Sequence, residues 1–353
     1  MFLRILRQET SADGGAALAE YLGDLFCDPF GRDGEIASRV HVAQDGRLTG
    51  FIGVLPQMME LDGERLRVAI CTTWMVDDHE ADPFAGARLL KAVLSGPQDL
   101  TFSETSNDLS TAMWRRMGAH VLASYSLEYL RVIRPAGFAA RMAANRFRLL
   151  GAFAPLARLA DQVVGAGANR LSFAGYRPSA GKADTLVATE PDEGELVTAI
   201  QELVVHHPLH PCWSDEQLSR MLVHARLKVK HGARVQRILR SRGGRLAGLF
   251  IYFGDRGGIG RVMQVIAAPG MAGLVVERLL ANAHARGLVA IRGRTQPALL
   301  DAMLDRKFAF LHASSTVFHS SRPELADAAT QGRAFLNGLS GESWTRLIGD
   351  RFS

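Results

Sequence analysis

The chain has 353 residues, of which 47% are hydrophobic and 22% are charged, a balance typical of a soluble globular protein that excludes wholesale disorder. The 41 Lys and Arg residues only slightly exceed the 36 Asp and Glu residues and form no basic stripe interleaved with aromatic residues, so no nucleic-acid partner is expected. The three cysteines have neither metal-ligand spacing nor the density of a disulfide scaffold. We expect a cytoplasmic protein of two domains, at roughly 100–200 residues per domain.

Hydrophobic periodicity predicts the elements of the first half in this order: a helix at 13–26, strands at 47–59 and 65–76, a helix at 84–94, a strand at 100–103, a helix at 108–117 and a long strand at 120–133. Asp62-Gly63 has the composition of a hairpin turn between the first two strands. Pro83 suits the start of a helix, and Asn107 can cap the helix that Gly118 ends. No apolar run of about 18 residues predicts a transmembrane helix.

Residues 135–178 combine apolar and arginine positions as an amphipathic helix that breaks near Pro155 and leads to a glycine-rich joint at 165–168. We interpret this stretch as a bridge between two domains. The alternative is a weak membrane-surface contact through residues 136–160, with Phe and Leu among the lipids and Arg at anionic headgroups.

The second half has a similar predicted order: helices at 193–206 and 214–226, strands at 233–241, 246–254 and 260–267, a helix at 271–286, a strand at 288–293, a helix at 297–305 and a strand at 309–320. Two stretches of the first half return here in register: residues 45–52 match 243–250, and residues 105–122 match 295–312 without gaps. The sequence therefore predicts one unit present twice, as a domain at 1–134, a helical linker at 135–181 and a domain at 182–353.

Two further motifs are interpreted as loops. His206, His207, His210 and Cys212 invite a metal site, but Pro208 interrupts the helix that would space the ligands regularly, so no metal is expected. Residues 254–260 are rich in glycine but lie between two strands, which indicates a hairpin turn and not a nucleotide-binding loop.

In each half, a hairpin and a strand lead through a turn into a helix, which offers backbone N–H groups to a phosphate. Residues 50–55, the strand end at 74–76, the helix at 83–94, and Asn107 with Trp114 and Gly118 together resemble the Gcn5-related N-acyltransferases. The resemblance covers residues 40–133 well and 233–320 faintly. It implies an α+β fold of two tandem domains, each a mixed, mostly antiparallel twisted sheet flanked by helices.

The same resemblance implies an acyltransferase that uses acetyl-coenzyme A or another acyl-coenzyme A as co-substrate to acylate a small amine. The residues it assigns to the coenzyme are Met75, Val76, Phe84, Ala85, Gly86, Ala87, Asn107 and Trp114. The sequence departs from the family at the diphosphate loop, which keeps only Gly86 and has Phe84 for a glycine. Trp114 stands where the family often has a tyrosine acid, and in the second half Pro297 and Leu304 stand at the positions of Asn107 and Trp114.

Such a transfer needs a base and donors that polarise the thioester carbonyl. We expect Glu104 to be the base, with Asp78 and His79 as further candidates; each is otherwise a solvated polar residue of a loop. Arg292 and Arg294 are expected either to bind a substrate carboxylate or to form surface ion pairs. The eroded loop and missing tyrosine favour an alternative function, a catalytically inactive pair of domains that serves as a binding or scaffold module.

Overall fold

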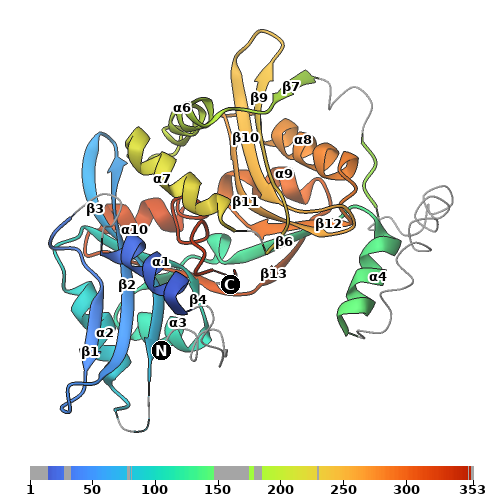
Figure 1. Cartoon of the computed structure of the whole chain (residues 1–353). Coiled ribbons are helices and arrows are strands. Elements are labelled where there is room, and N and C mark those ends of the chain that lie inside the picture. Colours follow the sequence, from blue (N-terminus) through green and yellow to red (C-terminus); the bar gives the residue numbers. More distant parts are fainter. Residues whose placement is uncertain are drawn as a thin grey trace. The chain divides into compact units, whose positions relative to one another are not determined.

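A computed structural model describes residues 15–27, 33–77, 80, 82–146, 175–178, 185–228, 230–348 and 350. The chain forms two compact units (Figure 1). Unit 1 comprises Met1–Ser126, His207–Lys228 and Ala313–Ser353, and unit 2 comprises Leu127–His206 and Val229–His312. Each unit therefore contains segments of both predicted domains.

Unit 1 is built on a mixed sheet. Its strands, in spatial order, are β1 (Arg39–Val42), β2 (Leu48–Leu61), β3 (Glu64–Val76), β4 (Leu100–Ser106), β14 (Ser315–His319) and β5 (His120–Val121), with β8 (Leu209–Pro211) also paired to β2. Only β3 and β4 run parallel among these pairs. The β2–β3 turn has the predicted chemistry, because Asp62 and Gly63 both have positive φ, 51° and 86°, as a tight hairpin turn of the right twist requires.

The helices of unit 1 are α1 (Gly15–Phe26), α2 (Ala85–Leu94), α3 (Asp108–Arg116), α7 (Asp215–Arg226) and α10 (Pro323–Thr330), with a 3₁₀ turn, η2, at Ala123–Tyr125. The α2 helix buries Leu89, Leu90 and Val93 in a cluster with Ile52 and Val54 of β2. Burial of these side chains, at about 1.5–3 kcal/mol each, fixes α2 against the sheet.

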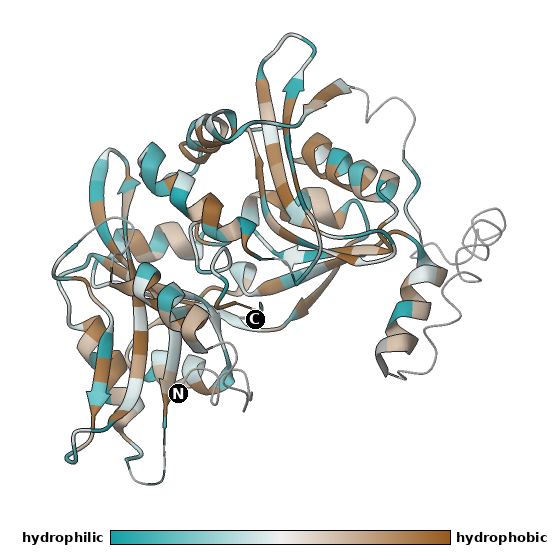
Figure 2. Cartoon of the chain, in the orientation of Figure 1, coloured by the Kyte–Doolittle hydropathy of each residue, from teal (hydrophilic) through white to brown (hydrophobic). Residues whose placement is uncertain are grey.

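Unit 2 repeats this plan. Its sheet has the order β13 (Ala309–His312), β6 (Leu127–Val132), β12 (Ala290–Arg294), β11 (Ile259–Ala267), β10 (Leu246–Phe253), β9 (Arg234–Ser241) and β7 (Leu186–Thr189). Its helices are α4 (Pro135–Arg146), α6 (Glu193–Val204), α8 (Ala272–Ala285) and α9 (Leu300–Leu304), with a 3₁₀ turn, η5, at Pro297–Leu299. Hydrophobic and hydrophilic residues alternate along α8 (Figure 2), and its apolar positions Val275, Val276, Leu279 and Leu280 are buried in the core of the unit.

The last strands of the two halves are exchanged. The predicted strand at 120–133 is instead two strands in different sheets, β5 in unit 1 and β6 in unit 2. The chain turns between them because the N–H groups of Tyr125 and Ser126 and the Ser126 hydroxyl all donate to the carbonyl of Leu122. The predicted strand at 309–320 is likewise divided into β13 in unit 2 and β14 in unit 1. The prediction of single long strands was therefore wrong.

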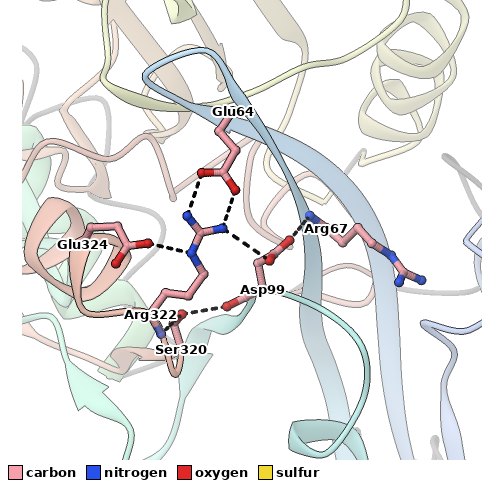
Figure 3. Close-up of polar contacts among 6 residues, drawn as sticks. All are labelled: Glu64, Arg67, Asp99, Ser320, Arg322 and Glu324. Carbon is pink, nitrogen blue, oxygen red and sulfur yellow. Dashed lines mark hydrogen bonds and ion pairs between the residues drawn. The ribbon is translucent and has the colours of Figure 1, made fainter.

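An ion-pair network fastens the end of β14 to the sheet of unit 1 (Figure 3). The Arg322 guanidinium donates to both carboxylate oxygens of Glu64, 2.7 Å each, and to Glu324 at 2.7 Å. The Ser320 hydroxyl donates to the carbonyl of Asp99, whose carboxylate accepts from the N–H of Arg67. These contacts tie the segment after β14 to the first residues of β3 and β4.

Some predicted features lie outside the described residues. They include Asp78 and His79, and residues 147–160 of the stretch considered for membrane contact. Within the described part of the chain, none of the helices has both the length and the apolar character needed to cross a bilayer.

Candidate functional site

The parallel strands β3 and β4 separate at their carboxyl ends. Their ladder covers only three pairs and ends at Ile70 and Phe102, although both strands continue. Beyond this point β3 carries a bulge opposite β2, since Phe51 pairs with Met75 but Gly53 pairs with Thr72. Thr73, inside the bulge, has φ of 54°. Positive φ is costly for a β-branched residue, and both bulges and such strain concentrate at functional sites.

A cavity of about 270 Å³ lies at this opening of unit 1. Its lining residues come from the two strands, α3 and the C-terminal residues: Ile52, Cys71, Thr72, Thr73, Trp74, Ser103, Thr105, Ser106, Asn107, Ser110, Trp114, Glu342, Leu347 and Ile348. Six hydroxyl residues, Asn107 and Glu342 thus share the lining with apolar residues. Convergent polar groups in a cavity are typical of a small-molecule site.

Glu342 is the one charged residue in this lining and is 1% exposed. Its carboxylate accepts hydrogen bonds from the N–H of Thr105 at 3.0 Å, the Thr105 hydroxyl at 2.6 Å and the Ser103 hydroxyl at 3.2 Å. Thr72 of β3 donates to it as well. The carboxyl group therefore lies in the opening itself. There it accepts the N–H of Thr105, which lies beyond the last β3–β4 pair.

Burial raises the pKa of Glu342 above its ordinary range, because the charged form loses water. The hydroxyl donors of Thr105, Thr72 and Ser103 oppose this shift, while the nearby charge of Glu104 adds to it. A carboxyl group of raised pKa inside a cavity has the properties of a general acid or base. Glu342 was not predicted as a site residue, although it is the one charged residue among residues 334–345, which is a signal of burial.

Glu104, the predicted base, faces a different environment. It is fully buried, and it is not among the lining residues of the cavity. Successive side chains of a strand point to opposite faces, so Ser103 and Thr105 reach Glu342 while Glu104 points away from them. Its carboxylate accepts from the N–H groups of Gly338, Glu342 and Ser343 at 3.1–3.2 Å. Glu104 is therefore bonded to the backbone of residues 338–343 and is poorly placed to take a proton from a substrate.

The first turn of α2 holds several residues assigned to the coenzyme. Ala85 and Gly86 are buried, whereas Phe84 is 70% exposed and does not plug the turn. The N–H of Phe84 donates to the Asp82 carboxylate at 3.2 Å, and Arg88 pairs with that carboxylate. In the described part of the chain, the N–H groups of Gly86 and Ala87 meet no acceptor. Two amides of this turn therefore remain for an anion, beside a carboxylate that already occupies a third.

Asn107 caps α3 as predicted, since its side chain accepts from the N–H of Ser110 at 2.8 Å. Asn107 and Trp114 both line the cavity, and Trp114 is 1% exposed. Met75 and Val76 are buried at the end of β3 and do not line the cavity. The structure thus brings two of the assigned residues to the cavity through α3.

Arg292 and Arg294 lie on β12 of unit 2. Arg292 pairs with Glu128, which also accepts from Arg261 at 3.1 Å. Burial would raise the pKa of Glu128, but the two guanidinium groups outweigh it and lower that pKa. Arg292 therefore has a buried carboxylate partner within unit 2. Among the described residues, no group of three or more His, Cys, Asp and Glu side chains is arranged to hold a metal.

Three solved structures resemble the chain, each at 11% identity. They are a Gcn5-related N-acetyltransferase from Kribbella flavida (TM-score 0.50), another from Anabaena variabilis (0.53) and a conserved protein from Enterococcus faecalis described as a probable N-acyltransferase (0.52). The chain has the Gcn5-related N-acetyltransferase fold. The likenesses cover 91%, 89% and 90% of this chain and 65%, 72% and 68% of theirs, so about a third of each neighbour has no counterpart here. No family model and no curated protein matches the sequence.

Proposed function

We propose that unit 1 transfers an acyl group from a coenzyme A thioester to a small amine, with Glu342 as the general base. The observation that carries the proposal is the buried Glu342 carboxyl group in the opening between β3 and β4, facing a cavity of about 270 Å³. The fold is that of proteins named N-acetyltransferases, which supports the class of reaction. The substrates are proposed from the chemistry of the site.

The chemistry needs few groups. The amine must lose a proton before it attacks the thioester carbonyl, and the Glu342 carboxylate can accept that proton inside the cavity. The amine nitrogen then forms a bond to the acyl carbon, the carbon–sulfur bond breaks, and the thiolate of coenzyme A leaves. The nitrogen loses its second proton to this thiolate or to solvent, which gives the amide. Since an indole is no acid, Trp114 cannot protonate the departing thiolate, and hydroxyl groups such as those of Ser106 and Ser110 are the donors available in the lining.

The site fits the thioester end of the coenzyme better than its diphosphate end. At the thioester end, the bulge at Thr73 and the separated strands leave main-chain and hydroxyl groups in the cavity lining. At the diphosphate end, the amides of Gly86 and Ala87 would serve a phosphate, with Arg88 as a nearby cation, but Asp82 carries a competing negative charge. This carboxylate is the observation that favours the alternative, an inactive binding or scaffold module.

Thiol release distinguishes the two functions. The purified chain is mixed with acetyl-, medium- and long-chain acyl-coenzyme A and a panel of small amines, and free coenzyme A is measured with a thiol reagent. We expect amine-dependent release that Glu342→Gln abolishes, while calorimetry shows that the variant still binds acyl-coenzyme A. The matched control is Glu324→Gln, since Glu324 is exposed at the surface of α10. Binding without turnover in the wild type would support the inactive module, and absence of both would refute the proposal.

A further inference from the structure

The C-terminal segment, residues 338–348, is held at both ends by buried charges. At its beginning, Glu104 accepts three of its N–H groups, those of Gly338, Glu342 and Ser343. At its end, the ammonium group of Lys228 donates to the carbonyls of Thr345 at 2.6 Å and Ile348 at 2.8 Å. Glu104 is fully buried and Lys228 is 5% exposed. The negative charge therefore meets amide hydrogens and the positive charge meets carbonyl oxygens.

Gly341 shows how closely Glu104 approaches the segment. A Cβ atom added to Gly341 would collide with the Oε2 atom of Glu104, lie 2.9 Å from its Cδ atom and lie 3.0 Å from the carbonyl oxygen of Leu336. No other residue type fits this position without moving the segment or the carboxylate. The next residue after this close approach is Glu342, and Leu347 and Ile348 follow in the cavity lining.

We propose that Glu104 and Lys228 are positioning residues that hold the C-terminal segment in the opening between β3 and β4, so that Glu342, Leu347 and Ile348 complete the cavity. The inference rests on the proposed function. It assigns a role to two buried polar residues that do not line the cavity. Buried charges are costly unless they are fully bonded, and here both are bonded to the backbone of one segment.

Two variants distinguish the position of residues 338–348 from the charge of Glu104. The charge of Glu104 contributes to the raised pKa of Glu342, and the charge of Glu342 in turn contributes to the raised pKa of the neighbouring Cys71 thiol. Glu104→Gln removes a negative charge that raises the pKa of Glu342 and replaces one acceptor of the N–H groups by a donor. Gly341→Ala displaces the same segment and leaves the charges unchanged. Both variants should lower kcat, but only Glu104→Gln should also shift the acid limb of the pH–rate profile to lower pH.

The experiment measures thiol release and amide hydrogen exchange on the full chain. We expect Glu104→Gln, Gly341→Ala and Lys228→Met each to lower kcat by about tenfold to hundredfold, the range that a displacement of about 1 Å at a reacting group can cost. KM for acyl-coenzyme A should change little, and exchange should accelerate in residues 338–348. The matched controls are Glu20→Gln and Lys230→Met, which alter exposed side chains.

Each outcome decides between the two claims. If exchange accelerates in residues 338–348 while kcat and the pH profile stay at wild-type values, the positioning role is wrong and the proposed function stands. If exchange does not accelerate, Glu104 and Lys228 do not hold the segment and the inference fails. If the wild type releases no thiol with any amine, the proposed function fails, and the positioning role fails with it.

Discussion

Corresponding positions on β4 of unit 1 and β12 of unit 2 differ in packing: the position on β4 borders a cavity, and the position on β12 is filled by a side chain. The repeat aligns Ser103 of β4 with Gly293 of β12, because residue 105 corresponds to residue 295. Ser103 pairs with Val317 of β14, whereas Gly293 pairs with Tyr129 of β6. A Cβ atom on Gly293 would lie 2.6 Å from the Tyr129 hydroxyl and 3.0 Å from the carbonyl of Val262 on β11.

In unit 2 the aromatic ring thus occupies the space over the strand, and Tyr129 is buried against Phe308 in the core. In unit 1, Val317 pairs with Ser103, whose hydroxyl donates to Glu342 in the lining of the cavity. At this position the sheet of unit 1 borders a cavity, whereas the sheet of unit 2 is closely packed. Tyr129 lies on β6 and Val317 on β14, so in each unit the residue at this position comes from an exchanged strand.

Removing the filling residue of unit 2 should have the largest effect on stability. Tyr129→Ala deletes a fully enclosed ring, and such a truncation costs about 3–5 kcal/mol of the free energy of unfolding. Ser103→Ala at the aligned place in unit 1 removes one hydroxyl bond and should cost about 1 kcal/mol. Urea unfolding followed by circular dichroism measures both. Equal losses at the two positions would contradict the contrast between filled and open sites.

Activity should depend on unit 1 alone. Glu342→Gln removes the base and should lower kcat at least about a hundredfold, the usual contribution of general base catalysis. Tyr129→Phe keeps the packing of unit 2 and should leave kcat unchanged. Steady-state thiol release at saturating amine checks both variants. A loss of turnover in Tyr129→Phe with normal turnover in Glu342→Gln would move the active site to unit 2.

The raised pKa of Glu342 predicts how stability changes with pH. The pKa of Glu342 is higher in the folded state than in the unfolded state. As pH rises between these two pKa values, the unfolded state loses its proton first and is favoured. The free energy of unfolding of the wild type should therefore fall relative to that of Glu342→Gln, which does not titrate. Urea titrations of both proteins from pH 4 to pH 8 measure the difference. A difference that is constant with pH, or a wild type that gains stability relative to Glu342→Gln as pH rises, would show that the carboxyl group is not held protonated.

The smallest effect is expected at the bulge of β3. Thr73 has positive φ, which costs a β-branched residue about 1–3 kcal/mol, and asparagine adopts this conformation more readily. Thr73→Asn should therefore raise the free energy of unfolding by about 1 kcal/mol while altering the cavity that Thr73 lines. Met263→Asn at the bulge of β11 in unit 2 is the comparison, because Met263 lies at the register shift without positive φ and is buried, so that variant should be destabilised. A destabilised Thr73→Asn would mean that the strain is compensated locally.

Local features of the fold could be predicted from the sequence. The Asp62-Gly63 turn, the Asn107 cap and the glycine after α3 are determined by the conformations that these residues themselves prefer. The exchange of β6 and β14 could not be predicted in this way, because an apolar strand has the same pattern whichever sheet it joins. The division at residues 122–126 depends on hydroxyl and amide bonds to one carbonyl, which periodicity does not reveal.

The candidate site was predicted only in part for the same reason. Asn107 and Trp114 reach the cavity through a helix that the sequence indicates directly. Glu342 reaches it from a segment more than two hundred residues away in the sequence, and only the burial of residues 334–342 in the folded chain shows that the segment belongs to the site. Glu104 has the expected charge on the expected strand, but strand alternation directs it to the backbone of that segment.

The most direct test is a crystal structure of the full chain soaked with a non-hydrolysable thioether analogue of acyl-coenzyme A. We expect density for the sulfur and acyl group in the opening between β3 and β4, beside Glu342, with the diphosphate at the first turn of α2. Density for the analogue at the first turn of α8 in unit 2, with the cavity of unit 1 empty, would contradict it.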